Sequence, residues 1–395
     1  MSNSRSVRRR LAVPPGPGVS RRSVLGGFGA VAGVSLLGPT ILAACGGDDG
    51  GGSGGDSGGA EALRFDNWPG YIDEETVGLF AEASGIDFSY TEAFNDNNEY
   101  FARVQADLAA GRDIGADIIA PTNWMAARLI DLGWVQEIPF GDIPNASNLV
   151  PELQSPTWDP DGTFSLPWQS GMTGIAYNVA ETGRELTSVG DLFDPAFAGK
   201  IGMLTEMRDT MGLLLLLDGV DPEDATIENA EGAFTRLEAA KDDGTIRQFT
   251  GNDYMDDLAS GNFVACIGWS GDISQLALDN PDLRFVIPAE GGMQWSDTMV
   301  LPNGAANVAA AAEWMNYVYD PVNAARITAY VGYNSPVSGV REILAASDDE
   351  FEQALAESPL VFPDEATLAQ LHIFKTLDEE EEAAFDERFS SIVGA

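Results

Sequence analysis

Apolar and polar residues alternate with two different periods along the chain from residue 63 onward. Residues 63–66 and 86–90 alternate with the period of two that is typical of a half-buried strand. Between them, residues 74–84 open with two acids, carry apolar positions on one face and stop at Gly85. That pattern predicts an amphipathic helix, because acids favour the first turn of a helix and glycine favours its end.

The same alternation of elements continues over the next thirty-five residues or so. Phe101, Val104 and Leu108 share one helical face, and Gly111 predicts the end of that helix. Residues 116–120 then form a short apolar run that predicts a third strand. Strand–helix–strand–helix–strand indicates an α/β fold with a mostly parallel sheet. In such sheets ligands bind beyond the carboxyl ends of the strands.

Tryptophans in Gly, Pro or Asn contexts stand at or beside four predicted strand ends. They are Trp68, Trp124, Trp269 and Trp295. A single tryptophan at such a position is more often a core residue or a surface cap. Four at equivalent positions favour a different interpretation, in which the indoles form the walls of one pocket.

The first 44 residues predict export from the cytoplasm. Arg21-Arg22 lies within a basic head, a weakly apolar stretch follows over residues 24–44, and Leu-Ala-Ala precedes Cys45. The arginine pair resembles a twin-arginine signal, and the string ending at Cys45 resembles the lipobox of a bacterial lipoprotein. The resemblance implies cleavage before Cys45 and lipidation of its thiol. The alternative is a signal cut nearby, with Cys45 as an ordinary residue.

Residues 45–60 are a Gly/Ser/Asp tract that predicts a flexible linker after Cys45.

The overall composition limits which partners the protein can have. The chain holds 62 Asp and Glu against 21 Lys and Arg, for a net charge of −41. Such a charge argues against nucleic acid and anionic lipid as partners and attracts cations. Apart from Cys45 the chain contains one cysteine, Cys266, whose apolar neighbours predict a buried residue.

Five short motifs carry a resemblance to a known family. They are NWPGY at 67–71, DIIAPT at 117–122, LTEMRD at 204–209, EGGMQWSD at 290–297 and GYNSP at 332–336. In this order they resemble the spermidine/putrescine-binding proteins of bacterial ABC importers, a branch of the periplasmic binding proteins of type II. The resemblance runs from about residue 63 to 340, and its most specific motif is EGGMQWSD.

This resemblance implies a fold and a function. The fold would be α/β with two lobes and a ligand cleft between them, lobe 1 taking 61–169 plus 296–339 and lobe 2 taking 170–295 plus 340–395. The protein would be a monomer that captures a polyamine outside the cytoplasm and delivers it to an ABC permease. It would be tethered by lipid in the periplasm or on the outer face of the cytoplasmic membrane. The resemblance implies neither an enzyme nor a cofactor nor a bound metal.

The resemblance also assigns the site. An alkylammonium needs aromatic faces for its methylenes and carboxylates for its charged nitrogens. Asp297 would grip one amine, Thr122 falls on a hydroxyl position, and Glu206 with Asp209 would supply a second anionic end. The aromatic walls would be Trp68, Tyr71, Trp124, Trp269, Trp295 and Tyr333.

Other interpretations remain open at this point. Pro69-Gly70 replaces a polar pair found in many family members, which leaves room for a mono-amine or a quaternary ammonium. Glu206 and Asp209 could instead be ordinary acids at a helix N-terminus, and Asp297 a strand-edge acid. An extracellular hydrolase could use two of these carboxylates as acid and base. A metal-binding relative is a third alternative, although residues 95–99 lack the spacing of a calcium loop and predict a polar turn or helix cap.

The lipobox generates a direct prediction. Cys45→Ser should release a soluble protein or leave the precursor uncleaved, because the hydroxyl cannot replace the lipidated thiol. Membrane fractionation with immunoblotting would measure this in the source organism or a related host. A mutant that stays in the membrane fraction with its signal removed would contradict the lipoprotein interpretation.

Overall fold

Local sequence signals set the ends of the first helices in the computed structural model, which describes residues 62–394. Asp73 caps α1 (Glu74–Ser84) by accepting from the backbone N–H of Thr76. Gly85 ends that helix in the left-handed region with φ +75°. Asp96 caps α2 (Asn97–Leu108) in the same way, so the predicted polar helix cap at 95–99 is confirmed. The helix itself ends at Leu108, three residues before the predicted stop at Gly111.

The strands form a single sheet with the path β2-β1-β3-β10-β5-β8-β6-β7, while β4 and β11 pair with β10 and β9 pairs with β5. Their bounds are β1 Ala62–Asn67, β2 Asp87–Glu92, β3 Ile118–Ile119, β4 Val135–Gln136, β5 Ser165–Asn178, β6 Ile201–Leu204, β7 Ile246–Thr250, β8 Ala265–Trp269, β9 Leu283–Val286, β10 Gly292–Pro302 and β11 Leu371–His372. The strand expected over 116–120 therefore shrinks to two paired residues.

The remaining helices alternate with these strands along the chain. Their bounds are α3 Asn123–Asp131, α4 Val179–Thr182, α5 Met207–Leu217, α6 Ile227–Asp242, α7 Tyr254–Ser260, α8 Ser270–Asp279, α9 Val308–Val318, α10 Pro321–Val331, α11 Val340–Ala345, α12 Glu350–Ala356, α13 Glu365–Leu368 and α14 Glu379–Val393. Within the described residues, none of these helices has the length and apolar character needed to cross a membrane.

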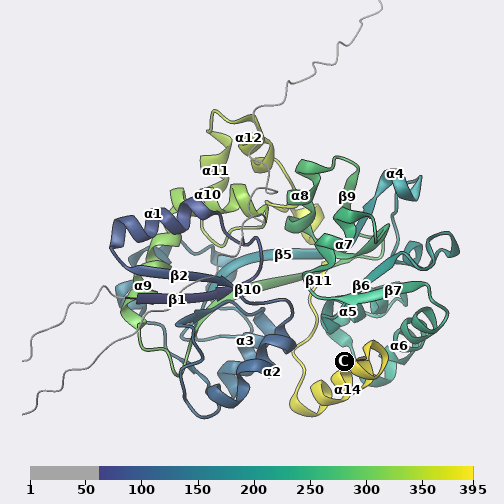
Figure 1. Cartoon of the computed structure of the whole chain (residues 1–395), viewed down its shortest axis with the longest axis horizontal. Helices are drawn as coiled ribbons and strands as arrows, with labels where there is room; N and C mark the ends of the chain where they lie inside the picture. Colours follow the sequence, from purple (N-terminus) through teal and green to yellow (C-terminus); the bar gives the residue numbers. More distant parts are fainter. Residues whose placement is uncertain (1–61, 395) are drawn as a thin grey trace, which may run out of the picture. The chain divides into compact units, whose positions relative to one another are not determined.

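The sheet contains two parallel blocks joined by an antiparallel pair. β1 runs parallel to β2 and β3, and β6 runs parallel to β7 and β8. Between the blocks lie the long strands β5 and β10, which are antiparallel to each other and to the blocks that they join (Figure 1). The expected parallel pairing is thus found within each block. The centre of the sheet is antiparallel instead, because β5 and β10 run opposite to each other and to the neighbouring strands of the blocks.

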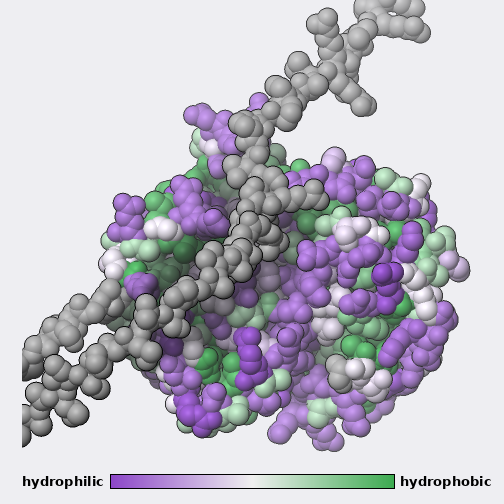
Figure 2. Space-filling view, viewed as in Figure 1, coloured by the Kyte–Doolittle hydropathy of each residue, from purple (hydrophilic) through white to green (hydrophobic). Residues whose placement is uncertain are grey.

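An aromatic core packs beside the first block. Phe65 of β1 contacts Trp168 of β5 edge-on at 5.7 Å between ring centroids, and Phe80 of α1 contacts Trp314 of α9 at 5.0 Å. Rings of this size bury large apolar areas and fix the relative position of helix and sheet. Cys266 is fully buried in β8, as its apolar neighbours predict. The face shown in Figure 2 is mostly hydrophilic, in keeping with the acidic composition.

The C-terminal segment returns to the centre of the molecule. β11 pairs in parallel with β10, with His372 opposite Met293. After it, α14 packs against α6 and α5 beside the second block (Figure 1, yellow). This arrangement brings residues near the chain's end close to those of α5.

Candidate functional site

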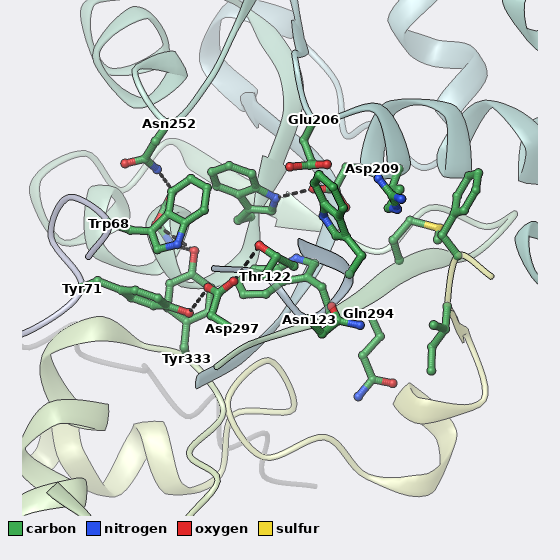
Figure 3. A pocket seen from close by; sticks show the side chains of 18 of the residues that line it. Trp68, Tyr71, Thr122, Asn123, Glu206, Asp209, Asn252, Gln294, Asp297 and Tyr333 are labelled. Carbon is green, nitrogen blue, oxygen red and sulfur yellow. Dashed lines mark hydrogen bonds between the residues drawn. The ribbon is translucent and has the colours of Figure 1, made fainter. Parts of the chain in front are cut away.

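All ten residues predicted for the site line one pocket at the centre of the sheet. The cavity between their side chains has a volume of about 50 Å³. Figure 3 labels Trp68, Tyr71, Thr122, Glu206, Asp209, Asp297 and Tyr333 among the side chains around this pocket. The ten are Trp68, Tyr71, Thr122, Trp124, Glu206, Asp209, Trp269, Trp295, Asp297 and Tyr333.

Most of these residues stand where strands or helices end. Trp68 follows β1, Trp269 is the last residue of β8, and Tyr333 comes directly after the residue that caps α10. The expectation of a strand end is wrong for Trp295, which lies inside β10 together with Asp297. The Gly-rich, polar stretch before residue 298 conceals this strand in the sequence, because several of its side chains face the pocket rather than the core.

Asp297 is a buried carboxylate held by two hydroxyl groups. Tyr71 Oη donates to its Oδ2 at 2.8 Å, and Thr122 Oγ1 donates to its Oδ1 at 2.7 Å. Only 3% of the residue is exposed. Burial raises the pKa of Asp297 to about 7, against the lowering effect of the two hydrogen bonds.

Asp209, in the first turn of α5, is the second buried carboxylate. Trp269 Nε1 donates to its Oδ2 at 2.8 Å, and Thr173 Oγ1 donates to its Oδ1 at 2.7 Å. Thr173 in turn accepts from Trp295 Nε1 at 3.0 Å. Burial raises the pKa of Asp209 to about 6. Asp209 therefore fixes the orientation of the Trp269 indole, and Thr173, which is bonded to Asp209, fixes that of Trp295.

Asp272 completes the acidic set and was missed by sequence reasoning. It accepts from Tyr333 Oη at 2.8 Å, from Tyr254 Oη at 2.9 Å and from Asn252 Nδ2 at 2.9 Å. Burial raises its pKa to about 6. The available signal was its place three residues after Trp269, in the helix turn that begins at the end of β8.

Glu206 stands at the N-cap of α5, yet its side chain caps no backbone N–H of that helix. Its Oε2 accepts instead from Asn97 Nδ2 at 3.0 Å, and the same amide lies 2.9 Å from Thr122 Oγ1. Burial, reinforced by the negative charges of Asp96 and Asp209, raises the pKa of Glu206 well above its ordinary value. Glu206 therefore bonds to α2 through Asn97 rather than capping α5 with its side chain.

Aromatic rings surround these carboxylates at close range. Successive ring centroids are 5.8 Å apart for Trp68 and Trp269, 6.2 Å for Trp269 and Trp295, and 5.5 Å for Trp295 and Tyr333. Tyr71 meets Tyr333 edge-on at 5.2 Å. Edge-to-face contacts of this kind hold the rings against one another.

Two glycines make this ring packing possible. A Cβ on Gly171 would lie 2.4 Å from the Trp295 ring, and one on Gly271 would lie 2.4 Å from the Tyr333 ring. Any larger residue at either position would displace the aromatic wall. These glycines, like Asp272, belong to the site but carry no motif signal of their own.

One cation also borders the pocket and was not predicted. The guanidinium of Arg208 lies 3.8 Å from the centroid of the Trp124 ring, and its Nη2 donates to Glu382 at 3.0 Å. Within residues 62–394, none of the four pocket carboxylates forms an ion pair with Lys, Arg or His. No cluster of His, Cys, Asp and Glu in that part of the chain is arranged to hold a metal ion.

A family model described as "Bacterial extracellular solute-binding protein" matches residues 76–356. The chain belongs to this family of extracellular solute-binding proteins.

Relatives and solved structures extend the comparison. This solute-binding protein is 28% identical to the putrescine-binding periplasmic protein PotF of Escherichia coli, over 80% of this chain and 87% of that protein. It is 26% identical to spermidine/putrescine-binding periplasmic protein 1 of Haemophilus influenzae, over 77% of this chain and 81% of that protein. The spermidine/putrescine substrate-binding protein PotD of Streptococcus pneumoniae superposes with a TM-score of 0.68 at 25% identity, covering 84% of this chain and 98% of that one.

The TpPotD lipoprotein of Treponema pallidum superposes with a TM-score of 0.69 at 18% identity, over 85% of this chain and all of that one. These matches confirm the predicted family resemblance and the α/β fold of two-lobed periplasmic binding proteins. The family is one of extracytoplasmic solute binders rather than of enzymes. The predicted signal, linker and Cys45 lie outside the described residues.

The raised pKa of Asp297 generates a prediction about the ligand-free protein. Its folded pKa of about 7 lies above the value of about 3.9 for an exposed Asp, so between these values the folded state binds more protons than the unfolded state. The resulting stabilisation is fully present below about pH 4 and is lost as the pH rises through about 7. From about pH 5.5 to 8, the free energy of unfolding should fall by about 2 kcal/mol more in the parent than in Asp297→Asn.

Denaturant unfolding across that pH range would measure the difference. Asn keeps the shape of the side chain and does not titrate, and Glu352→Gln, outside the pocket, serves as the control. Parallel pH profiles for the parent and Asp297→Asn would contradict the prediction.

Proposed function

We propose that this protein captures a polyamine, a putrescine- or spermidine-like cation, and delivers it to an ABC importer. One observation carries the proposal. Four buried carboxylates, Glu206, Asp209, Asp272 and Asp297, face a single aromatic pocket, and none forms an ion pair within the described chain.

The electrostatics of the pocket favour a cationic ligand. A buried carboxylate without a cation is costly, and it relieves the cost by taking a proton. A ligand that brings its own positive charges would compensate several of these groups at once. Charge-assisted hydrogen bonds from ammonium groups to carboxylates are about twice as strong as neutral ones.

The aromatic walls suit the remainder of such a ligand. Methylene groups pack well on indole faces, and an ammonium over an aromatic ring gains about 0.5–2 kcal/mol. Trp68, Trp269 and Trp295 offer such faces within the pocket. The printed names of the relatives, which bind putrescine or spermidine, support the same class of ligand.

A mono-amine or a quaternary ammonium solute is the second candidate. Pro69 lines the pocket, and Pro69-Gly70 offers no side-chain acceptor where many family members carry a polar pair. The hydrolase hypothesis has less support. Both oxygens of Asp209 and of Asp297 already accept hydrogen bonds from the protein, which suits fixed recognition better than proton transfer.

Delivery would depend on the anchor and on two lobes. We propose a lipid anchor at Cys45 after a twin-arginine signal, with residues 45–60 as a spacer and a monomeric body. The lobes would be 61–169 plus 296–339 and 170–295 plus 340–395. Their boundaries fall inside β5 and β10 where these strands pair, Ser170 opposite Ser296. A ligand that contacts both lobes would favour the closed state.

Calorimetry with a panel of solutes tests the proposed function. Putrescine, spermidine, choline, maltose and phosphate would be titrated into the protein. We expect heat from at least one polyamine and none from maltose or phosphate, because the unpaired carboxylates repel anions and a neutral sugar leaves them uncompensated. Heat from maltose or phosphate, with none from any amine, would overturn the proposal.

Variants then test the assigned pocket with the best amine. Asp297→Asn preserves shape but removes charge and should weaken binding by about 2–5 kcal/mol. Trp295→Ala should also weaken binding through lost ring contacts. Glu352→Gln, which removes an acid outside the pocket, should leave the affinity unchanged. Equal affinity of Asp297→Asn and the parent at the same salt would show that the ligand lies elsewhere.

A further inference from the structure

We infer that Glu382, on the C-terminal helix α14, is a positioning residue that holds Arg208 against Trp124 and so closes one end of the pocket. The inference rests on the proposed function in one respect, that this pocket holds the ligand. Neither the arginine nor the glutamate belongs to the set of side chains expected to bind the amine.

The first step is the fixation of Arg208. Its side chain is 8% exposed, its Nη2 donates to Glu382 Oε2 at 3.0 Å, and its guanidinium lies 3.8 Å from the Trp124 ring centroid. Its Nε and Nη1 have no hydrogen-bond partner within residues 62–394. Glu382 is therefore the side chain that fixes this buried guanidinium in place over the indole.

The second step is the contact of Glu382 with another helix. Arg128 Nη1 lies 3.5 Å from Glu382 Oε1, so the two oxygens of one carboxylate serve two arginines. Arg128 stands four residues after Trp124 on α3, and residues at this spacing share a helix face. Glu382 thus acts on Trp124 from two directions, through the stacked Arg208 and through the helix that carries the indole.

The third step is the position of these helices in the sheet. α3 packs against β10 and follows β3, whereas α5 follows β6 and packs against α14. In the sheet, β3 and β6 lie on opposite sides of the central pair β10 and β5. The carboxylate of Glu382 therefore joins elements from the two sides of the pocket, a contact that must break if the two sides separate to release a ligand.

The fourth step is the origin of this contact in the sequence. The family match ends at residue 356, yet Ile373 and Phe374 line the pocket and Glu382 follows on the next helix. The closing contact is thus supplied by the C-terminal segment that also brings Ile373 and Phe374 to the pocket. We expect this segment to set how long the ligand stays bound rather than which amine is recognised.

Dissociation kinetics of the complex with the tightest amine of the panel test the inference. Glu382→Gln should raise the dissociation rate constant about tenfold, because a charge-assisted hydrogen bond to a buried arginine is lost, and should leave the association rate constant unchanged. The matched control is Glu380→Gln, the same change on an exposed position of α14. Arg128→Met should raise dissociation less and should be non-additive with Glu382→Gln, because both changes disrupt one contact.

A second measurement does not depend on a polyamine. Hydrogen exchange of the ligand-free full chain should increase over α3 in Glu382→Gln and remain at the parental level in Glu380→Gln. Asp386, one turn along α14, lies near enough for the charges of Arg208 and Arg128 to act on it, so its carboxylate could replace that of Glu382. If Asp386 takes over the contact in Glu382→Gln, the double variant Glu382→Gln/Asp386→Asn should still show the full increase in dissociation and in exchange over α3.

The outcomes separate the two proposals. If no amine binds the parent, the proposed function fails while the exchange result still reports on the contact. If amines bind, and neither Glu382→Gln nor the double variant differs from Glu380→Gln in dissociation or in exchange over α3, the inference about Glu382 is wrong.

Discussion

The burial of four carboxylates that form no ion pair in the described chain is the constraint on which the site depends. Each carboxylate remains inside only because hydroxyl, indole or amide groups donate to it, as Tyr71 and Thr122 do for Asp297. These donors satisfy the oxygens but do not neutralise the charge, so burial raises the pKa instead. The folded protein thus retains an electrostatic cost that a cationic ligand can remove.

The fold supplies the positions that this constraint requires. Asp297 comes from the central strand β10, Asp209 from the start of α5 and Asp272 from the start of α8. The long antiparallel strands β5 and β10 bring the two parallel blocks together, and their junction carries Trp295 and Asp297. Close ring packing against Gly171 and Gly271 then fixes the aromatic walls beside these carboxylates.

The sequence predicted much of this arrangement for physical reasons. The first strands and helices follow from periodicity and caps, as at Asp73 and Gly85. The motif residues converge because strand ends and helix starts in an α/β sheet meet at one edge. β10 was harder to predict from the sequence, because side chains that face a polar pocket interrupt the apolar alternation that reveals a strand.

Long-range polar contacts were beyond sequence reasoning. Glu382 and Arg208 are 174 residues apart, and neither lies in a pattern that marks the other. Asp272 carries no motif signal in the sequence, and only the fold shows that Tyr254, Tyr333 and Asn252 all donate to it. Such pairings depend on packing between elements that are distant in the chain.

Proton release on binding tests the central claim most directly. Putrescine would be titrated at about pH 6.5 into the protein in two buffers with different enthalpies of ionisation. If the ligand's ammonium groups compensate the carboxylates, their pKa values fall and on the order of one proton is released per ligand bound. The observed heat should then differ between the buffers, and the difference should shrink in Asp297→Asn. Binding with the same heat in both buffers, or with proton uptake, would contradict the account.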